Sequence, residues 1–171
     1  MTVTHKRLLL VFVCACAAGV LLHFVHDWLP CAVTALFSPV RESLWEHVKL
    51  LFWPILAAGL VLCRRDRAAL RPWLLSGLIV IALMLSAGWL FHIVLGGESM
   101  AFDIGLYLAL MAAAFLLPRL FPGPWTGLFW ELVIWLAAAV GVAVVLFTFW
   151  PPDGPLFADL SGAPTWARLP L

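Results

Sequence analysis

The sequence predicts an all-α fold: a polytopic transmembrane helix bundle of about five spans. Of the 171 residues, 65% are hydrophobic and only 11% are charged, which is not the composition of a soluble domain. The apolar residues also gather into runs long enough to cross the hydrocarbon core of a bilayer, which is about 30 Å thick. We therefore expect an integral membrane protein whose main surroundings are the lipid bilayer.

The predicted spans follow one another with short breaks. They are expected at Leu8–Leu29, Pro39–Cys63, Pro72–Leu95, about Ala101–Phe121, and Trp125–Trp150. Breaks between spans are basic or rich in Gly and Pro, which interrupt helices. Residues 1–150 then form one transmembrane domain, and the Pro-rich residues 151–171 form an extracytoplasmic tail without a long apolar segment.

The first apolar run has two readings. It follows His5, Lys6 and Arg7, and it contains the small residues Ala15-Cys16-Ala17-Ala18. A short basic start before an apolar run with small residues is also typical of a cleaved signal peptide. The apolar run continues well past those small residues, which favours a retained transmembrane span.

The basic residues predict the orientation of the bundle. Lys6 and Arg7, the four arginines of segment 64–71, and Arg119 all fall on one side of a five-span protein. The other side has only Arg41 and Arg168. Because cytoplasmic loops carry an excess of Lys and Arg, we expect the N-terminus inside and the C-terminus outside.

A polar block opens the second predicted span. Ser38 is expected to be the helix N-cap and Pro39 to occupy the first helical position. On such a helix Glu42, Glu46 and Lys49 lie at i, i+4 and i+7 and share one face. An ionised side chain at the bilayer centre costs at least roughly 2.5–3.5 kcal/mol, so these groups need partners.

Other polar residues fall on the same outer side in this topology. His23 is expected to be buried, whereas His26 and Asp27 are expected to reach interfacial water beside Trp28. His92 and Asp103 lie at the outer ends of the third and fourth spans. Glu131, near the inner end of the fifth span, is expected to be a solvated anchor.

Two readings of this cluster remain open. A divalent metal such as zinc accepts imidazole nitrogen and carboxylate oxygen, and the candidate ligands are His23, Glu42, His47 and Asp103. Without a metal, Lys49 pairs with Glu42 or Glu46, and His23 hydrogen-bonds to them. A ligand-binding or polar network would further include Asp27, Arg41, Trp45 and Asp159. No HExxH or CxxC spacing decides between the readings.

The block from Ser38 to Lys49 resembles the signature P-V-N-E-S-x-W-E-H-x-K of an uncharacterised family of small prokaryotic membrane proteins, the domain-of-unknown-function group six-five-one-two. His23, Asp103-Ile104 and the tail residues Phe147-Thr148, Pro151-Pro152, Pro155, Phe157 and Asp159 also match it. Arg41 stands where the family has Asn, and this cation could pair with Glu42 or Asp27. The resemblance implies a multi-pass protein of a prokaryotic inner or plasma membrane and supplies no activity.

Two functions from different classes follow. In the first, the polar site binds an ion or small ligand or locks the bundle, in a homo-oligomer or a larger membrane complex. In the second, the protein is a metal-dependent membrane-embedded hydrolase or transferase acting on a lipid or lipid-linked substrate, with Glu46 as base and Lys49 or Arg41 stabilising negative charge. The chain has no Gly-rich phosphate loop and no basic patch interleaved with aromatics, which excludes nucleic-acid partners.

Overall fold

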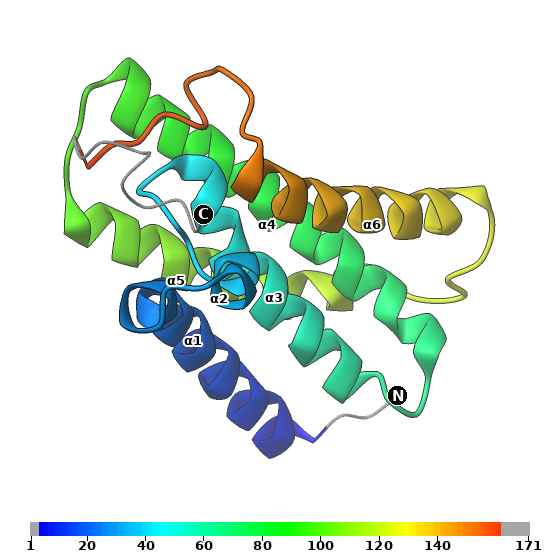
Figure 1. The fold of residues 1–171 in the computed structure, drawn as a ribbon. Coiled ribbons are helices and arrows are strands. Elements are labelled where there is room, and N and C mark those ends of the chain that lie inside the picture. Colours follow the sequence, from blue (N-terminus) through cyan, green and yellow to red (C-terminus); the bar gives the residue numbers. More distant parts are fainter. Residues whose placement is uncertain (1–3, 162–171) are drawn as a thin grey trace.

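A computed structural model describes residues 4–161, and within them the chain is all helical. Its α-helices are α1 (His5–Trp28), α2 (Ala32–Phe37), α3 (Leu44–Leu62), α4 (Leu70–Gly88), α5 (Met100–Leu116) and α6 (Leu128–Phe149). The 3-10 turns η1 (Arg67–Ala69) and η3 (Leu117–Leu120) flank α4 and α5, and the π-helical turn η2 (Trp89–Val94) extends α4. Figure 1 shows their arrangement.

Five of these helical stretches are long and apolar enough to cross a membrane, as the sequence predicts. They are His5–Trp28, Leu44–Leu62, Arg67–Val94, Met100–Leu120 and Leu128–Phe149. Only the short α2 is too brief to span, and the sequence did not predict it. The described helices therefore confirm an all-α bundle with five candidate spans.

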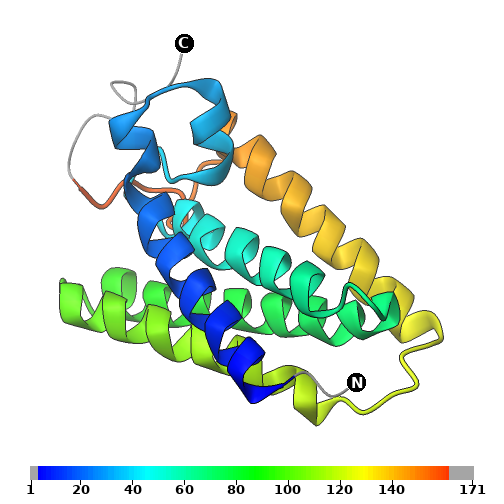
Figure 2. The ribbon, with the colours of Figure 1, turned by 90° about the horizontal axis from the view of Figure 1, so that it is seen from below.

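Helix α3 lies at the centre of the bundle. It contacts α1, α4, α5 and α6, and Figure 2 shows it between α1 and α6. In the apolar stretch of α3 that could span a membrane, 56% of the residues are buried, against 11% in that of α1. A helix buried on most sides is the least exposed to lipid, so polar residues on α3 are surrounded by protein.

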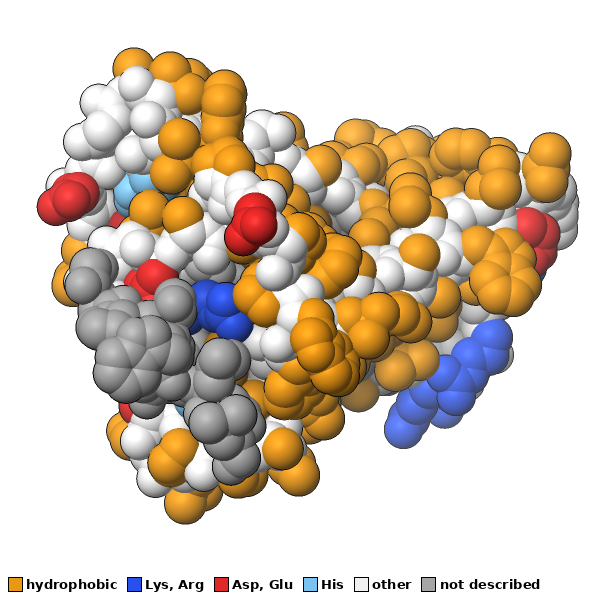
Figure 3. Space-filling model, turned by 45° about the horizontal axis from the view of Figure 1, so that its top comes forward, with side chains coloured by type: hydrophobic (Ala, Val, Ile, Leu, Met, Phe, Trp, Pro, Cys, Tyr) orange, Lys and Arg blue, Asp and Glu red, His pale blue; other side chains and the backbone are white. Residues whose placement is uncertain are grey.

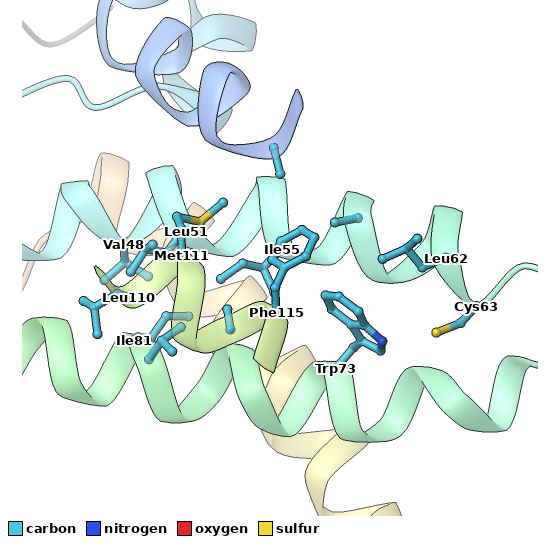
Figure 4. Close-up of a cluster of buried hydrophobic side chains, with 14 of the residues drawn as sticks. Val48, Leu51, Ile55, Leu62, Cys63, Trp73, Ile81, Leu110, Met111 and Phe115 are labelled. Atoms are coloured by element: carbon cyan, nitrogen blue, oxygen red, sulfur yellow. The ribbon is translucent and has the colours of Figure 1, made fainter. Parts of the chain in front are cut away.

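The apolar core forms where α3 meets α4 and α5. Figure 4 shows side chains of the three helices pointing into one shared space. The core includes Val48, Leu51 and Ile55 from α3, Trp73 and Ile81 from α4, and Leu110, Met111 and Phe115 from α5. The Phe115 ring stands edge-on to the Trp73 ring, with centroids 5.0 Å apart. These contacts fix α3 against the rest of the bundle.

Large apolar side chains also cover the outside of the bundle. In Figure 3 hydrophobic side chains cover most of the visible flank, and charged side chains gather toward its two ends. Leu9, Val20, Leu108, Leu136 and Val142 are among the exposed apolar residues. An exterior of this kind suits hydrocarbon rather than water.

The contact between α1 and its neighbours depends on Gly19. A Cβ at this position would collide with the Tyr107 hydroxyl and would lie 2.8 Å from the Leu50 carbonyl oxygen. Tyr107 donates from there to the Cys16 carbonyl at 2.9 Å. Small residues allow such close helix approach in membranes.

We predict that Gly19→Ala destabilises the protein by about 1–3 kcal/mol, the usual cost of overpacking. Gly105→Ala is the matched control, because a Cβ there meets nothing within 4 Å. Thermal unfolding in detergent measures both variants. Equal midpoints for the two would show that α1 does not pack as described.

Candidate metal and polar site

Helix α3 begins later than the sequence predicts. We expected Ser38 as the N-cap and Pro39 as the first helical residue, and this is wrong. Ser43 is the N-cap, and its Oγ accepts from the Glu46 backbone N–H at 3.3 Å. Residues 38–43 form a loop that connects α2 to α3. Glu42 therefore lies on this loop and not on the face of a helix.

A buried ion pair holds that loop against α3. The Lys49 Nζ lies 2.6 Å from the Glu46 Oε2, and both side chains are almost fully buried. Lys49 also donates to the Ala35 carbonyl at 2.7 Å and to the Ser38 carbonyl at 3.1 Å. All three ammonium hydrogens thus have acceptors. Of the two predicted partners of Lys49, Glu42 and Glu46, the structure shows Glu46.

The Glu46 carboxylate has a second contact with the loop. Its Oε2 accepts from the Val40 backbone N–H at 2.9 Å, in addition to Lys49. Its Oε1 is buried and has no hydrogen-bond partner among the described residues. One carboxylate and one ammonium therefore hold α2, the loop and α3 together. We call this pair with its backbone acceptors the lock.

Helix α2 packs against the C-terminal end of α1, and this contact corrects the prediction for His26. We expected His26 to reach interfacial water, but it is buried. Its Nδ1 lies 3.1 Å from the Thr34 Oγ1 of α2. The Ser38 hydroxyl accepts from the His26 backbone N–H and donates to the Leu22 carbonyl, two groups that a regular helix pairs with each other.

Three of the predicted metal ligands come together beside the lock. One ligand atom from each of His23, Glu42 and His47 lies within 4.8 Å of the other two. The His47 Nε2 lies 3.4 Å from the Glu42 Oε2. Atoms bound to tetrahedral zinc at about 2.0–2.1 Å lie roughly 3.3 Å apart, so this spacing already fits a zinc ion. The residues come from α1, the loop and α3.

Hydrogen bonding orients the histidine nitrogens in a way that suits a metal, and the His47 Nε2 pairs with Glu42 in this structure. The His47 Nδ1 lies 2.8 Å from the Ser43 carbonyl oxygen, which can only accept, so Nδ1 carries the proton. In a neutral ring, Nε2 then presents its lone pair toward Glu42. Metal-bound histidines are commonly oriented in this way by a backbone carbonyl. The His23 Nδ1 is buried without a hydrogen-bond partner among the described residues.

The fourth predicted ligand, Asp103, lies outside this group of three. Its Oδ1 accepts from the His92 Nε2 at 2.8 Å, and the His92 Nδ1 contacts the Gly97 carbonyl at 2.9 Å. Both ring nitrogens of His92 are therefore occupied. Asp103 still interacts electrostatically with His47. The His92–Asp103 pair therefore lies near the three candidate metal ligands without belonging to them.

The remaining predicted residues lie in different parts of the bundle. Arg41 is buried and donates to the Thr148 carbonyl at 3.0 Å. The expected pairing with Asp27 is wrong, and the pairing with Glu42 stays a prediction. Asp27 is exposed and, within residues 4–161, makes no hydrogen bond or ion pair. The Trp45 ring contacts Phe147 and Phe157. Glu131, expected to be simply solvated, pairs with Arg71 at 2.8 Å.

The C-terminal residues return to the same place. Leu160 donates its backbone N–H to the Glu42 carbonyl at 2.8 Å, and Leu156 accepts from the Trp45 N–H at 2.9 Å. Asp159 accepts from the Ser161 backbone and hydroxyl through Oδ1, whereas its Oδ2 is buried without a partner in the described chain. The part of the tail after Ser161 lies outside the described residues.

Comparison with known proteins assigns the chain to one family. The Family of unknown function (DUF6512) matches residues 1–163, which is almost the whole chain. The protein belongs to DUF6512. No curated protein and no solved structure matches it.

In this DUF6512 protein the true start of α3 was not predicted, although the sequence contains a signal for it. Ser43-Leu44-Trp45-Glu46 has the S-x-x-E spacing of a capping box, which marks a helix start. Here Ser43 caps as the pattern predicts, but the Glu46 carboxylate reaches the Val40 N–H. No sequence signal identified the Ala35 and Ser38 carbonyls as partners of Lys49, because backbone acceptors carry no side-chain signature.

The lock predicts a large stability cost for Glu46→Gln. Removing one charge leaves the Lys49 ammonium buried and unpaired, which typically costs about 3–5 kcal/mol. Glu131→Gln breaks the half-exposed pair with Arg71 and is expected to cost about 1 kcal/mol or less. Chemical denaturation in detergent compares the two. Similar losses would contradict a structural lock.

Proposed function

We propose that this protein binds a divalent metal ion such as zinc at His23, Glu42 and His47. The observation that carries the proposal is the meeting of three suitable ligand atoms within 4.8 Å, from three different segments of the chain. Two imidazoles and one carboxylate form a common catalytic zinc set, and such sets keep a fourth position open.

Burial and accessibility support the same proposal. The side chains of His47 and Glu42 are 29% and 40% exposed, so an ion can reach them without unfolding the bundle. The His47 Nδ1 contact with the Ser43 carbonyl fixes which nitrogen faces the ion. The buried His23 Nδ1, which has no hydrogen-bond partner among the described residues, would gain the metal ion as its partner. Each feature lowers the cost of binding a metal here.

In this proposal Glu46 and Lys49 form the frame of the site. Lys49 has no ammonium hydrogen left to stabilise developing negative charge, because Ala35, Ser38 and Glu46 occupy all three. The pair fixes the loop that bears Glu42. Their predicted catalytic roles are therefore less well supported than a role in holding the metal ligands in place.

An extracytoplasmic position for the site is part of the proposal. Arg7 donates to the Val61 carbonyl at the far end of α3, and Arg71 lies beside Glu131 at the start of α6. Arg7 and Arg71 thus lie at the end of the bundle opposite His23 and His47. Because cytoplasmic loops carry an excess of cations, we place this end on the cytoplasmic side of a prokaryotic inner or plasma membrane.

The alternative function is a metal-dependent hydrolase or transferase acting on a lipid or lipid-linked substrate. It is favoured because three protein ligands would leave a fourth position on the metal for a water, which the metal would activate for attack. The Glu46 Oε1, which has no hydrogen-bond partner among the described residues, is then the candidate base. A transport role would need a homo-oligomer or a larger complex, because five spans leave little room for a pore.

We predict about one zinc per chain in protein purified in detergent and incubated with zinc, measured by elemental analysis after gel filtration. His23→Ala, Glu42→Gln and His47→Ala remove ligands and should lose the ion. His92→Ala is the matched control and should retain it, because both His92 nitrogens already contact other groups. Wild-type protein that is folded and free of metal would overturn the proposal.

A further inference from the structure

We infer that the segment 151–161, called the strap, positions Glu42 for the metal, so that strap docking and metal binding are coupled. The inference rests on the proposed metal site. It concerns a region that the sequence predicts to be only a tail outside the membrane. In the structure this region contacts the residues on which the site is built.

The strap is attached to the first turn of α3 and to the loop before it by one backbone hydrogen bond each. The Leu156 carbonyl accepts from the Trp45 N–H at 2.9 Å, and the Leu160 N–H donates to the Glu42 carbonyl at 2.8 Å. Trp45 lies in the first turn of α3, where backbone N–H groups have no partner within the helix. The strap therefore completes the start of α3 and contacts a metal ligand directly.

Aromatic packing anchors the strap between two helices. The Phe157 ring lies 5.3 Å from the Trp45 ring of α3 and 5.5 Å from the Phe147 ring of α6, centroid to centroid. Trp45 and Phe147 also contact each other at 5.4 Å. Three rings at such separations form a favourable cluster, so Phe157 holds the strap next to the Leu156 contact.

Glu42 is the ligand that most needs external support. His23 lies within α1 and His47 within α3, so helical hydrogen bonds fix their backbones. Glu42 lies on the loop 38–43, where its carbonyl bonds to the strap. Groups that orient a metal ligand typically change metal affinity by about 10–100-fold when they are removed.

Coupling of this kind must act in both directions. If the docked strap improves the position of Glu42, then a bound metal must stabilise strap docking by the same factor. Undocking of the strap would weaken metal binding without altering any ligand. The strap can thus act as a positioning element for Glu42 and, when it is displaced, as a means of releasing the ion.

The test compares Leu160→Pro with Leu160→Ala. Proline removes the N–H that donates to Glu42, whereas alanine retains it and controls for the lost side chain. Zinc affinity of the full chain in detergent is measured by competition with a chromophoric chelator. We expect about 10–100-fold weaker binding for Leu160→Pro and nearly unchanged binding for Leu160→Ala.

If the proline variant fails to fold, hydrogen exchange on the wild-type protein tests the same coupling without a substitution in the strap. Zinc should slow exchange of the Leu160 amide, and His92→Ala should show the same slowing. Equal zinc affinities of the two Leu160 variants, or no effect of zinc on the Leu160 amide, would overturn the strap role alone. Wild-type protein that binds no zinc would overturn both the strap role and the metal site.

Discussion

The Lys49 ammonium is the group on which the rest of the site depends. It lies in the central helix, fully buried, and its three hydrogens hold the end of α2, the loop after it and the Glu46 carboxylate. An unpaired charge there would be very costly, so the chain must keep these acceptors in place. The loop is consequently fixed in a membrane protein whose other contacts are mostly apolar packing.

That fixed loop explains how the three candidate ligands of the proposed metal site come together at one end of the bundle. Glu42 reaches between His23 of α1 and His47 of α3 because the lock holds the loop from one side and the strap contacts it from the other. Helices α1 and α3 supply only two of the three candidate ligands, and the loop supplies the third. The site is thus a property of the tertiary structure, and a change in the loop or the strap alters it without touching a histidine.

Composition and periodicity predicted the helices well but not the connections between them. The five spans follow from long apolar runs, and the Glu46–Lys49 pairing follows from helical spacing. The start of α3 and the existence of α2 depend on hydrogen bonds between Ser38, the backbone of α1 and the lock. Such contacts join residues distant in sequence, so local patterns placed His26 in water and missed the hydrogen bond from Arg41 to the Thr148 carbonyl.

The most direct test of the account is zinc K-edge X-ray absorption on the zinc-incubated wild-type protein in detergent. The account predicts a first shell of two imidazole nitrogens, one carboxylate oxygen and one water oxygen at about 2.0–2.1 Å. His47→Ala, incubated with zinc in the same way, should lose the ion and should not show this shell. A shell containing sulfur, or one with only water oxygens, would contradict binding at His23, Glu42 and His47.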